Sequence, residues 1–352
     1  MEKLSLRKNS CWFFKLAIVL WGCVGAASAQ EARPGVMLER PVGALALALA
    51  GATTAGGGSF CSFVNPALLT FVRTRQLAFG TGLATMGRAE GFISGEFAVS
   101  PRVGMGINLL YRGDPFLNNL HDENEDPIGS GAFTTITVKT ALSCRFTREF
   151  TAGMAIGIYY QELPSGYATD GSLFYSSSMS IGGLSAGLLY EITPQHSVGL
   201  TLRELNNATN WNIPFYDYVD PTPETIDPIL TAGYSGRYVL LKRPLMVSAD
   251  LTAFVFTNTF ALRTYKHAAL SIGADWRYNE LLSLRAGCGQ FPLSADMVYD
   301  GAAYTDYASA MVSAGCGLEL EKLVHGLTCN FAIASDKAWS GIDSQIDFVL
   351  KF

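Results

Sequence analysis

From residue 76 to the end of the chain, apolar residues alternate with polar or small ones in segments of about ten residues. In LLSLRAGCGQ, for example, Leu282 and Leu284 fall on one face, whereas Ser283 and Arg285 fall on the other. A period of two residues with one wholly apolar face is typical of a β-strand, and no helical stripe competes with it. This length also suits a tilted strand that crosses a membrane. The pattern therefore predicts membrane-spanning strands.

The alternation predicts fourteen strands, and their connections alternate between short and long. Tight turns at one rim and long loops at the other are typical of an outer-membrane barrel. Because an unpaired backbone amide in hydrocarbon costs several kcal/mol, a spanning sheet must close on itself. We therefore predict an all-β fold, a fourteen-stranded antiparallel transmembrane β-barrel. The strands are expected at 76–86, 91–99, 102–112, 132–146, 150–161, 173–192, 196–206, 228–237, 244–257, 267–278, 281–290, 307–321, 326–335 and 344–352.

The sequence ends on an alternating segment, SQIDFVLKF, in which Phe348, Leu350 and the final Phe352 share one face. A strand that ends on an outward aromatic resembles the signal by which outer-membrane barrels are recognised for assembly. We expect Phe352 to contact the barrel assembly machinery and the apolar face to contact outer-membrane lipids. The barrel is expected to be a monomer in the cell outer membrane.

Residues 1–29 have the pattern of a secretory signal peptide. Basic residues such as Lys3 and Arg7 precede an apolar stretch, and the small residues ASA precede Gln30. A rival interpretation takes LWGC as a lipidation motif at Cys23, but the tryptophan in that motif is too bulky for the usual pattern. Both interpretations predict export from the cytoplasm.

Composition excludes some partners and some ways of crossing a membrane. Removing the signal peptide takes one acid and four bases from the 30 acids and 25 bases of the whole chain, which leaves 29 and 21, a net charge of −8. Phosphate binding depends on Lys and Arg, so we expect no nucleic-acid partner. Hydrophobic residues make up 49%, yet after residue 30 no apolar run of 18 or more residues suits a spanning helix. We therefore expect the apolar residues to lie in strands.

The face opposite the apolar one carries charges of both signs, and in a barrel it would line the lumen. We expect most of these charges to pair and stiffen the barrel. Some are candidates to contact the polar head of a ligand, and the alternation does not distinguish them. The predicted lumen residues are Glu96, Lys139, Arg203, Asp250, Asp275, Arg277 and Arg285.

Residues 30–75 do not alternate like the rest, and they are small, apolar and rich in glycine. A disordered periplasmic leader would expose their leucines and phenylalanines to water, whereas a segment folded into the barrel would plug it. The glycine run 56–58 suits bends with positive φ, and Asn65 suits the cap of a short helix that begins at Pro66. We predict a plug (hatch) at 30–75. Its marker residues are Asn65, Pro66, Ala67 and Leu68.

The motif NPALLTF, which leads directly into RQLAFGTGLA, resembles the N-terminal hatch of the FadL long-chain fatty-acid transporter family. The preceding GALALALAGATTA resembles the GARALALGGA opening of the PorV and PorQ-like barrels. The resemblance covers the whole mature chain, although only the plug motif is residue-specific. GGGSFCSFV replaces the acidic Asp-Asp-Ala stretch usual before this motif, and the chain is shorter than typical FadL transporters. The implied division is a signal peptide at 1–29, a plug at 30–75 and a barrel at 76–352.

The resemblance implies an outer-membrane channel for uptake of long-chain fatty acids or other hydrophobic compounds. A hydrophobic small molecule or lipid would be captured by extracellular loops, pass a plug that moves, and leave through a lateral opening. The alternative is a PorV-like barrel that binds secreted proteins in type IX secretion, or a structural outer-membrane protein. Aromatic residues in NWNIPFYDYVDP are candidates for ligand binding, although they also suit a lid or a belt at the lipid headgroups. These candidates are Trp211, Phe215, Tyr216 and Tyr218.

No motif predicts a catalytic residue, a metal site or a cofactor. The acidic stretch HDENEDP lacks the regular spacing of a calcium loop, and no His-x-x-x-His or Cys/His cluster suggests zinc. His196 and Ser197 are neighbours on a strand, so their side chains point to opposite faces and do not form a relay. A surface-lipid enzyme is therefore the weakest functional hypothesis.

Overall fold

The structure is a computed structural model, which describes residues 40–352 apart from several internal segments. The predicted signal peptide and the first residues of the predicted plug lie outside the described residues. The segments left out are 85–87, 114–119, 122–126, 131–132, 168–172, 210, 213–223, 227, 259–262, 296–297, 300–301, 304–309 and 336–340.

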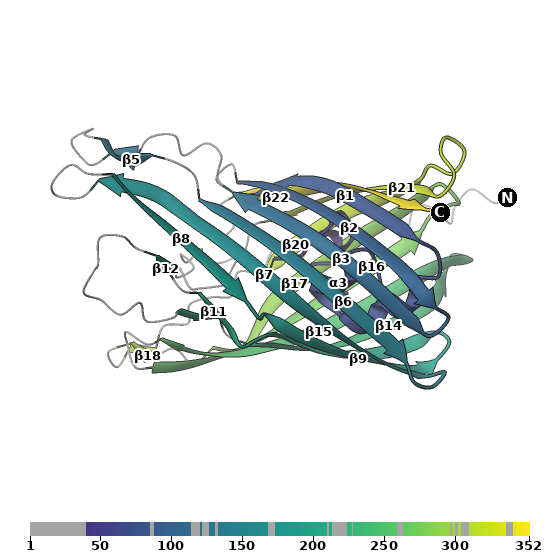
Figure 1. Ribbon diagram of the computed structural model, residues 1–352. Helices are drawn as coiled ribbons and strands as arrows, with labels where there is room; N and C mark the ends of the chain where they lie inside the picture. The colour runs from purple at the N-terminus through teal and green to yellow at the C-terminus, as the bar shows by residue number, and fades with distance from the viewer. Residues whose placement is uncertain are drawn as a thin grey trace.

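Long strands that run obliquely to the barrel axis form the wall (Figure 1). They are β1 (Gln76–Leu83), β2 (Ala89–Ser100), β3 (Val103–Gly113), β6 (Thr134–Arg145), β7 (Phe150–Tyr167), β8 (Leu173–Ile181), β9 (Leu184–Thr193), β10 (His196–Leu205), β14 (Ile229–Leu240), β15 (Arg243–Asn258), β16 (Arg263–Arg277), β17 (Leu282–Ala295), β20 (Met311–Glu319), β21 (Leu327–Ser335) and β22 (Ile342–Lys351). The short strands are β4 (Leu120–His121), β5 (Pro127–Ser130), β11 (Asn207–Thr209), β12 (Trp211–Asn212), β13 (Glu224–Ile226), β18 (Val298–Tyr299) and β19 (Ala302–Ala303).

The first and last strands pair with each other, which closes the barrel. Gln76 of β1 lies opposite Lys351 of β22, and the antiparallel pairing continues to Leu83 and Ser344. The sheet contains eighteen strands, of which β4, β5 and β12 are short additions, while β8 and β9 are successive parts of one wall strand. Fourteen strands therefore make the wall, and the predicted fold class is confirmed.

The strand predicted at 173–192 is interrupted, and the prediction ran across a one-residue shift in the alternation at this point. Gly182 has a φ of 137° and separates β8 from β9. The β8–β9 side also has one extra residue here. Ala155 of β7 lies opposite Ser185 and Ile158 lies opposite Ile181, so three steps along β7 correspond to four steps along its partner. On the next strand, Glu204 has a φ of 62°, beside a second register shift. Two neighbouring strands are thus irregular at the same level of the wall.

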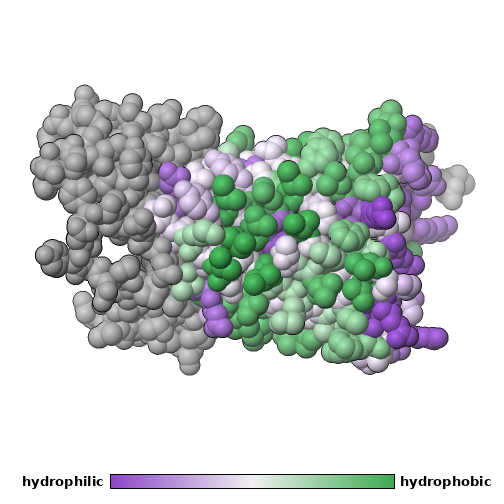
Figure 2. All heavy atoms as spheres, viewed as in Figure 1, coloured by the Kyte–Doolittle hydropathy of each residue, from purple (hydrophilic) through white to green (hydrophobic). Residues whose placement is uncertain are grey.

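The outer face of the wall is apolar. Phe79, Ile107 and Met154 point outward and are about half exposed. Figure 2 shows hydrophobic residues spread over the strands and a hydrophilic rim at one end of the barrel. Tight connections such as 101–102 and 194–195 lie at this rim, which we call the turn end, and we call the opposite rim the loop end. A closed barrel with an apolar outer face indicates an outer-membrane protein.

Among residues 40–75, three short helices precede the barrel: α2 (Ala44–Ala48), α3 (Cys61–Val64) and the 3₁₀ helix η2 (Pro66–Phe71). Among the described residues, no helix is long and apolar enough to cross a membrane. The helices lie inside the wall, where their apolar residues form the core. Leu68 and Leu69 pack against Ala155 and other small residues of the inner face. The hydrophobic core thus lies between residues 40–72, here called the N-terminal segment, and the wall.

Candidate functional site

Wall carboxylates bind backbone N–H groups of the N-terminal segment. One oxygen of Asp250 on β15 accepts hydrogen bonds from the backbone nitrogens of Thr53 (3.0 Å) and Thr54 (2.9 Å). Such charge-assisted hydrogen bonds stabilise by roughly 1.5–3 kcal/mol each. Similar bonds of 2.6 Å join the nitrogen of Ala44 to Asp347, and that of Cys61 to Glu96. Three strands therefore fix the backbone of the segment at three separate points.

Asn65 connects the segment to itself and to the wall, and its side chain is fully buried. Its Oδ1 accepts from the backbone nitrogen of Ala67 (3.0 Å), so Asn65 caps η2, and Pro66 occupies the first turn. Its Nδ2 donates to the carbonyl oxygens of Thr54 (2.8 Å) and Leu188 on β9 (3.2 Å). The predicted cap is confirmed, and the link to the wall is an additional role that the sequence did not reveal.

Inward-facing glycines of the wall allow the segment to approach closely. A Cβ atom on Gly153 would lie 2.5 Å from the carbonyl carbon of Pro66, and one on Gly199 would lie 2.6 Å from the carbonyl oxygen of Thr54. No side chain fits at such distances without displacing the segment. We call these residues the glycine collar, which consists of Gly104, Gly153, Gly187, Gly199, Gly233, Gly273 and Gly287. A sequence signal did exist, because these glycines occupy positions on the polar side of the alternation.

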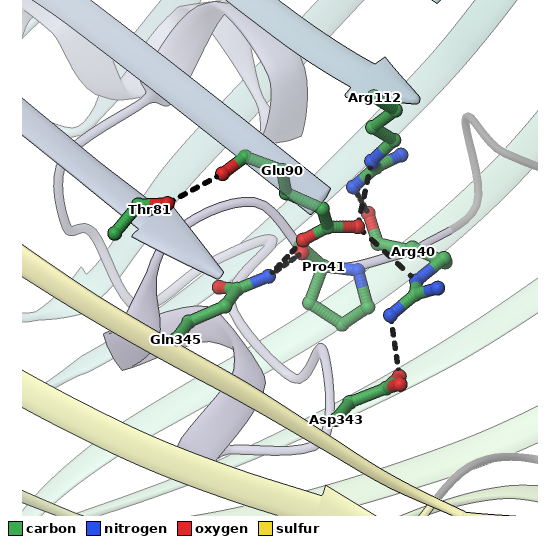
Figure 3. Close-up of polar contacts among 7 residues, drawn as sticks. All are labelled: Arg40, Pro41, Thr81, Glu90, Arg112, Asp343 and Gln345. Atoms are coloured by element: carbon green, nitrogen blue, oxygen red, sulfur yellow. Dashed lines mark hydrogen bonds and ion pairs between the residues drawn. The ribbon is translucent and has the colours of Figure 1, made fainter. Parts of the chain in front are cut away.

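A charged network at the loop end holds the start of the segment (Figure 3). Glu90 on β2 pairs with Arg112 of β3 (Nε–Oε1, 3.0 Å) and with Arg40 (Nε–Oε1, 3.4 Å). Arg40 also pairs with Asp343 on β22, at 2.5 Å. Nε2 of Gln345 donates to Glu90 (2.8 Å) and to the backbone carbonyl oxygen of Pro41 (3.2 Å). We call these five residues the N-terminal latch, and none of them was among the predicted site residues.

A second buried network lies beside the interruption of β8 and β9. Lys139 on β6 forms an ion pair with Glu204 on β10, and both side chains are almost fully buried. Glu204 also accepts from the Tyr159 hydroxyl (2.5 Å) and from Nδ2 of Asn207 (2.9 Å). The strand irregularity thus positions a carboxylate that three donors surround, and only Lys139 of this network was predicted to line the lumen.

The remaining predicted lumen residues divide into two groups. Arg203 donates to the carbonyl oxygen of Phe63 in α3 (3.3 Å), so it contacts the segment as Glu96, Lys139 and Asp250 do. Asp275 and Arg285 pair with each other at 3.2 Å. Arg277 is the last residue of β16 and is exposed at the turn end.

The predicted ligand-binding aromatics are placed only in part. Trp211 lies in β12, which pairs with β8, and nothing further is described of its side chain. Phe215, Tyr216 and Tyr218 lie outside the described residues. Their role in ligand binding stays a prediction.

A cavity of about 430 Å³ lies between the N-terminal segment and the strands β1, β17, β20, β21 and β22. Apolar side chains of the segment form one side, including Phe60, Leu68 and Phe71. Ligand pockets in proteins commonly have volumes of this order. The inside of the barrel therefore has space for a small molecule next to the segment.

No family model matches the chain, and no curated protein matches it. Several solved structures match the chain. The Pseudomonas putida toluene transporter TodX has 14% sequence identity and a TM-score of 0.60, with 88% of this chain and 98% of that chain covered. The monoaromatic hydrocarbon channel CymD has 13% identity and a TM-score of 0.59, over 91% and 99%. A Pseudomonas aeruginosa FadL homologue has 13% identity and a TM-score of 0.54, over 92% and 98%. At these identities the likeness shows a shared fold.

Proposed function

We propose that this protein is an outer-membrane channel for the uptake of hydrophobic compounds, with the N-terminal segment as its plug. The observation that carries the proposal is the way the segment is held. Its contacts with the wall are hydrogen bonds, ion pairs, apolar packing and close glycine contacts, and all of them can open and re-form without breaking a strand. The adjacent cavity supports a small ligand rather than a protein cargo. The shared fold with proteins described as a toluene transporter and a monoaromatic hydrocarbon channel adds support.

Movement of the plug is the step that such transport requires. In this proposal the segment blocks the lumen at the collar, so a ligand passes only when some of these contacts open. A hydrophobic molecule gains by leaving water for an apolar surface, at about 25 cal/mol per Å² of buried area. This gain offsets part of the cost of releasing the carboxylates Glu96, Asp250 and Asp347. Long-chain fatty acids are the proposed ligands within this class, with capture by the predicted loop aromatics and exit through a lateral opening.

Uptake by cells tests the proposal. Cells that lack the gene and close paralogues, with and without a plasmid copy, would be given labelled toluene and labelled oleate. Accumulation that depends on the plasmid copy supports the proposal, and accumulation of oleate supports the narrower one. If cells with and without the plasmid copy accumulate equal amounts of toluene and equal amounts of oleate, the proposal is overturned. Co-purification with secreted proteins, in place of uptake, would instead favour the PorV-like alternative.

A further inference from the structure

Three side chains at the turn end form a short hydrogen-bonded chain on the outer face of the wall. Nδ1 of His196 on β10 lies 2.7 Å from the hydroxyl oxygen of Tyr234 on β14, which lies 2.7 Å from the hydroxyl oxygen of Tyr238. Alternation along β14 places both tyrosines on the same face as Leu230, which is exposed on the outside of the barrel. These polar groups therefore face the lipid, close to the tight connection 194–195.

A glycine makes room for this chain of polar groups. Gly236 lies opposite His196 in the pairing of β10 with β14. A Cβ atom on Gly236 would lie 2.5 Å from the hydroxyl oxygen of Tyr234 and 2.9 Å from that of Tyr238. The two tyrosine rings thus lean over a position without a side chain, and their hydroxyls meet above it.

One donor of this chain has no partner among the described residues. The two tyrosines and a neutral imidazole carry three donors, and the two hydrogen bonds between them use two. If Nδ1 of His196 accepts, the remaining donor is the N–H of its Nε2. If Nδ1 donates, the remaining donor is the hydroxyl of Tyr238. In both arrangements, an acceptor from outside the protein would complete the network.

The hairpin of β14 and β15 adds positive charge beside these donors. Residues 229–249 contain no acid and three bases, which are Arg237, Lys242 and Arg243. None of these three side chains forms a hydrogen bond or an ion pair with another described residue. Arg243 is two residues before Leu245, which lies opposite Tyr238, so Arg243 and Tyr238 are diagonal neighbours on the outer face. Charge and free donor are therefore close together.

Aromatic side chains place this cluster at the level of the lipid head groups. Leu245 also lies opposite Trp276 on β16, whose ring centroid is 5.5 Å from that of Tyr278. On β9, Tyr190 is 48% exposed at the same end of the barrel. Tryptophan and tyrosine on the outside of a barrel are typical of a belt at the membrane–water interface. The tight turns of such barrels face the periplasm, so the neighbouring head groups belong to the phospholipids of the periplasmic leaflet.

We propose that His196, Tyr234, Tyr238 and Arg243 form a binding site for the head group of an anionic phospholipid. The phosphate would accept from the free donor of the hydrogen-bonded chain and from the guanidinium of Arg243, whose planar fork matches phosphate oxygens. The acyl chains would lie along the apolar outer face of β14 and β15. An anionic head group is preferred to a zwitterionic one, because Lys242 and Arg243 repel an ammonium. This site goes beyond the proposed function and does not depend on transport.

Selection between two phospholipids by the folded barrel tests the site. The full barrel would be placed in nanodiscs made from equal parts of phosphatidylglycerol and phosphatidylethanolamine with identical acyl chains. Native mass spectrometry would then count the lipids that each barrel retains. We expect the wild-type barrel to retain phosphatidylglycerol about tenfold more often than phosphatidylethanolamine. Arg243→Gln should lower this preference about fivefold, and Tyr238→Phe should lower it about threefold.

Two matched controls remove the same chemical groups elsewhere at the turn end. Arg148→Gln removes an exposed guanidinium from the connection between β6 and β7. Tyr190→Phe removes a hydroxyl from the aromatic belt on β9. Neither control should change the preference for phosphatidylglycerol. A loss in these controls equal to that in Arg243→Gln and Tyr238→Phe would show that the whole rim attracts anionic lipid, and it would overturn the site.

A further variant keeps every charge and changes only the position of the hydroxyls. Gly236→Val places a side chain where the tyrosine hydroxyls meet, so it should displace both and lower the preference about threefold or more. Heat-modifiable migration in gels would verify that each barrel is folded. An unchanged preference in a folded Arg243→Gln or Gly236→Val barrel would overturn the site. Binding of inorganic phosphate by the barrel, without a preference between the two lipids, would indicate a site for free anions and would also overturn it.

Discussion

Nδ2 of Asn65 lies 3.2 Å from the carbonyl oxygen of Leu188, a residue 123 positions later in the chain. The same side chain caps η2 and donates to Thr54, so a single amide joins a helix, the bend before it and a wall strand. Because Asn65 is fully buried, water does not replace these hydrogen bonds while the segment is in place. Asn65 therefore supplies the side-chain hydrogen bonds that link η2 both to the bend before it and to the wall.

Replacing Asn65 with alanine should loosen the plug without unfolding the barrel. The variant loses a helix cap, worth about 1 kcal/mol, and leaves the carbonyl of Thr54 without its partner, which costs about 1–3 kcal/mol. We expect ion conductance in planar bilayers to rise at least tenfold. Thr70→Ala is the control, because it removes only a partly exposed hydroxyl that donates to Ala67 (3.3 Å). Conductance equal to that of wild type would contradict the plug assignment.

The glycine collar makes a prediction about a single added methyl group. A Cβ on Gly153 would lie 2.5 Å from Pro66, so Gly153→Ala should displace η2 and increase leakage of small solutes into liposomes. Gly91 is the matched control on the wall, because a Cβ there meets no atom within 4 Å. Gly91→Ala should leave leakage unchanged. Equal leakage from both variants would show that the close approach does not hold the segment.

Cys61 offers a reporter of plug movement. Its thiol is buried, and burial raises its pKa well above the usual range, so it should stay protonated and unreactive while the segment is seated. We expect slow maleimide labelling of Cys61 in wild type and labelling about tenfold faster in Asn65→Ala, measured by mass spectrometry of the labelled peptide. Fast labelling of the wild-type thiol would mean that α3 is not packed as described.

The Lys139–Glu204 ion pair should stabilise the barrel only as a pair. Lys139→Met leaves a buried carboxylate without its cation, which we expect to lower the free energy of unfolding by about 3–5 kcal/mol. Adding Glu204→Gln should restore most of the loss, because the amide still accepts from Tyr159. Reversible urea unfolding in lipid vesicles measures both variants. Additive losses in the double variant would indicate that the two residues act independently.

The fold could be predicted because a membrane barrel repeats one local rule along the whole chain. The segment predicted at 344–352 is β22 (Ile342–Lys351), and the strand predicted at 150–161 is the first part of β7. The cap at Asn65 was also predictable, since its partner at Ala67 is two residues away. Local spacing is sufficient for features of both kinds.

Features that depend on register could not be predicted in this way. The latch joins Arg40, Glu90 and Asp343, which come together only when the first and last strands pair. The interruption at Gly182 adds a residue, so the outward apolar positions shift from Met179 and Ile181 to Leu188 and Tyr190, and the strand expected at 173–192 ran across this shift. Arg277 and Arg285 looked alike in sequence, and only the position of each along its strand places one at the rim and the other in the cavity lining.

Residues near the beginning of the sequence are bound by the strand that is made last. Ala44 requires Asp347 and Arg40 requires Asp343, and both carboxylates belong to β22. A growing or half-inserted chain therefore contains the N-terminal segment before it contains β22. The N-terminal segment can therefore make these contacts only once β22 is in place, so its complete docking requires the strand that closes the barrel.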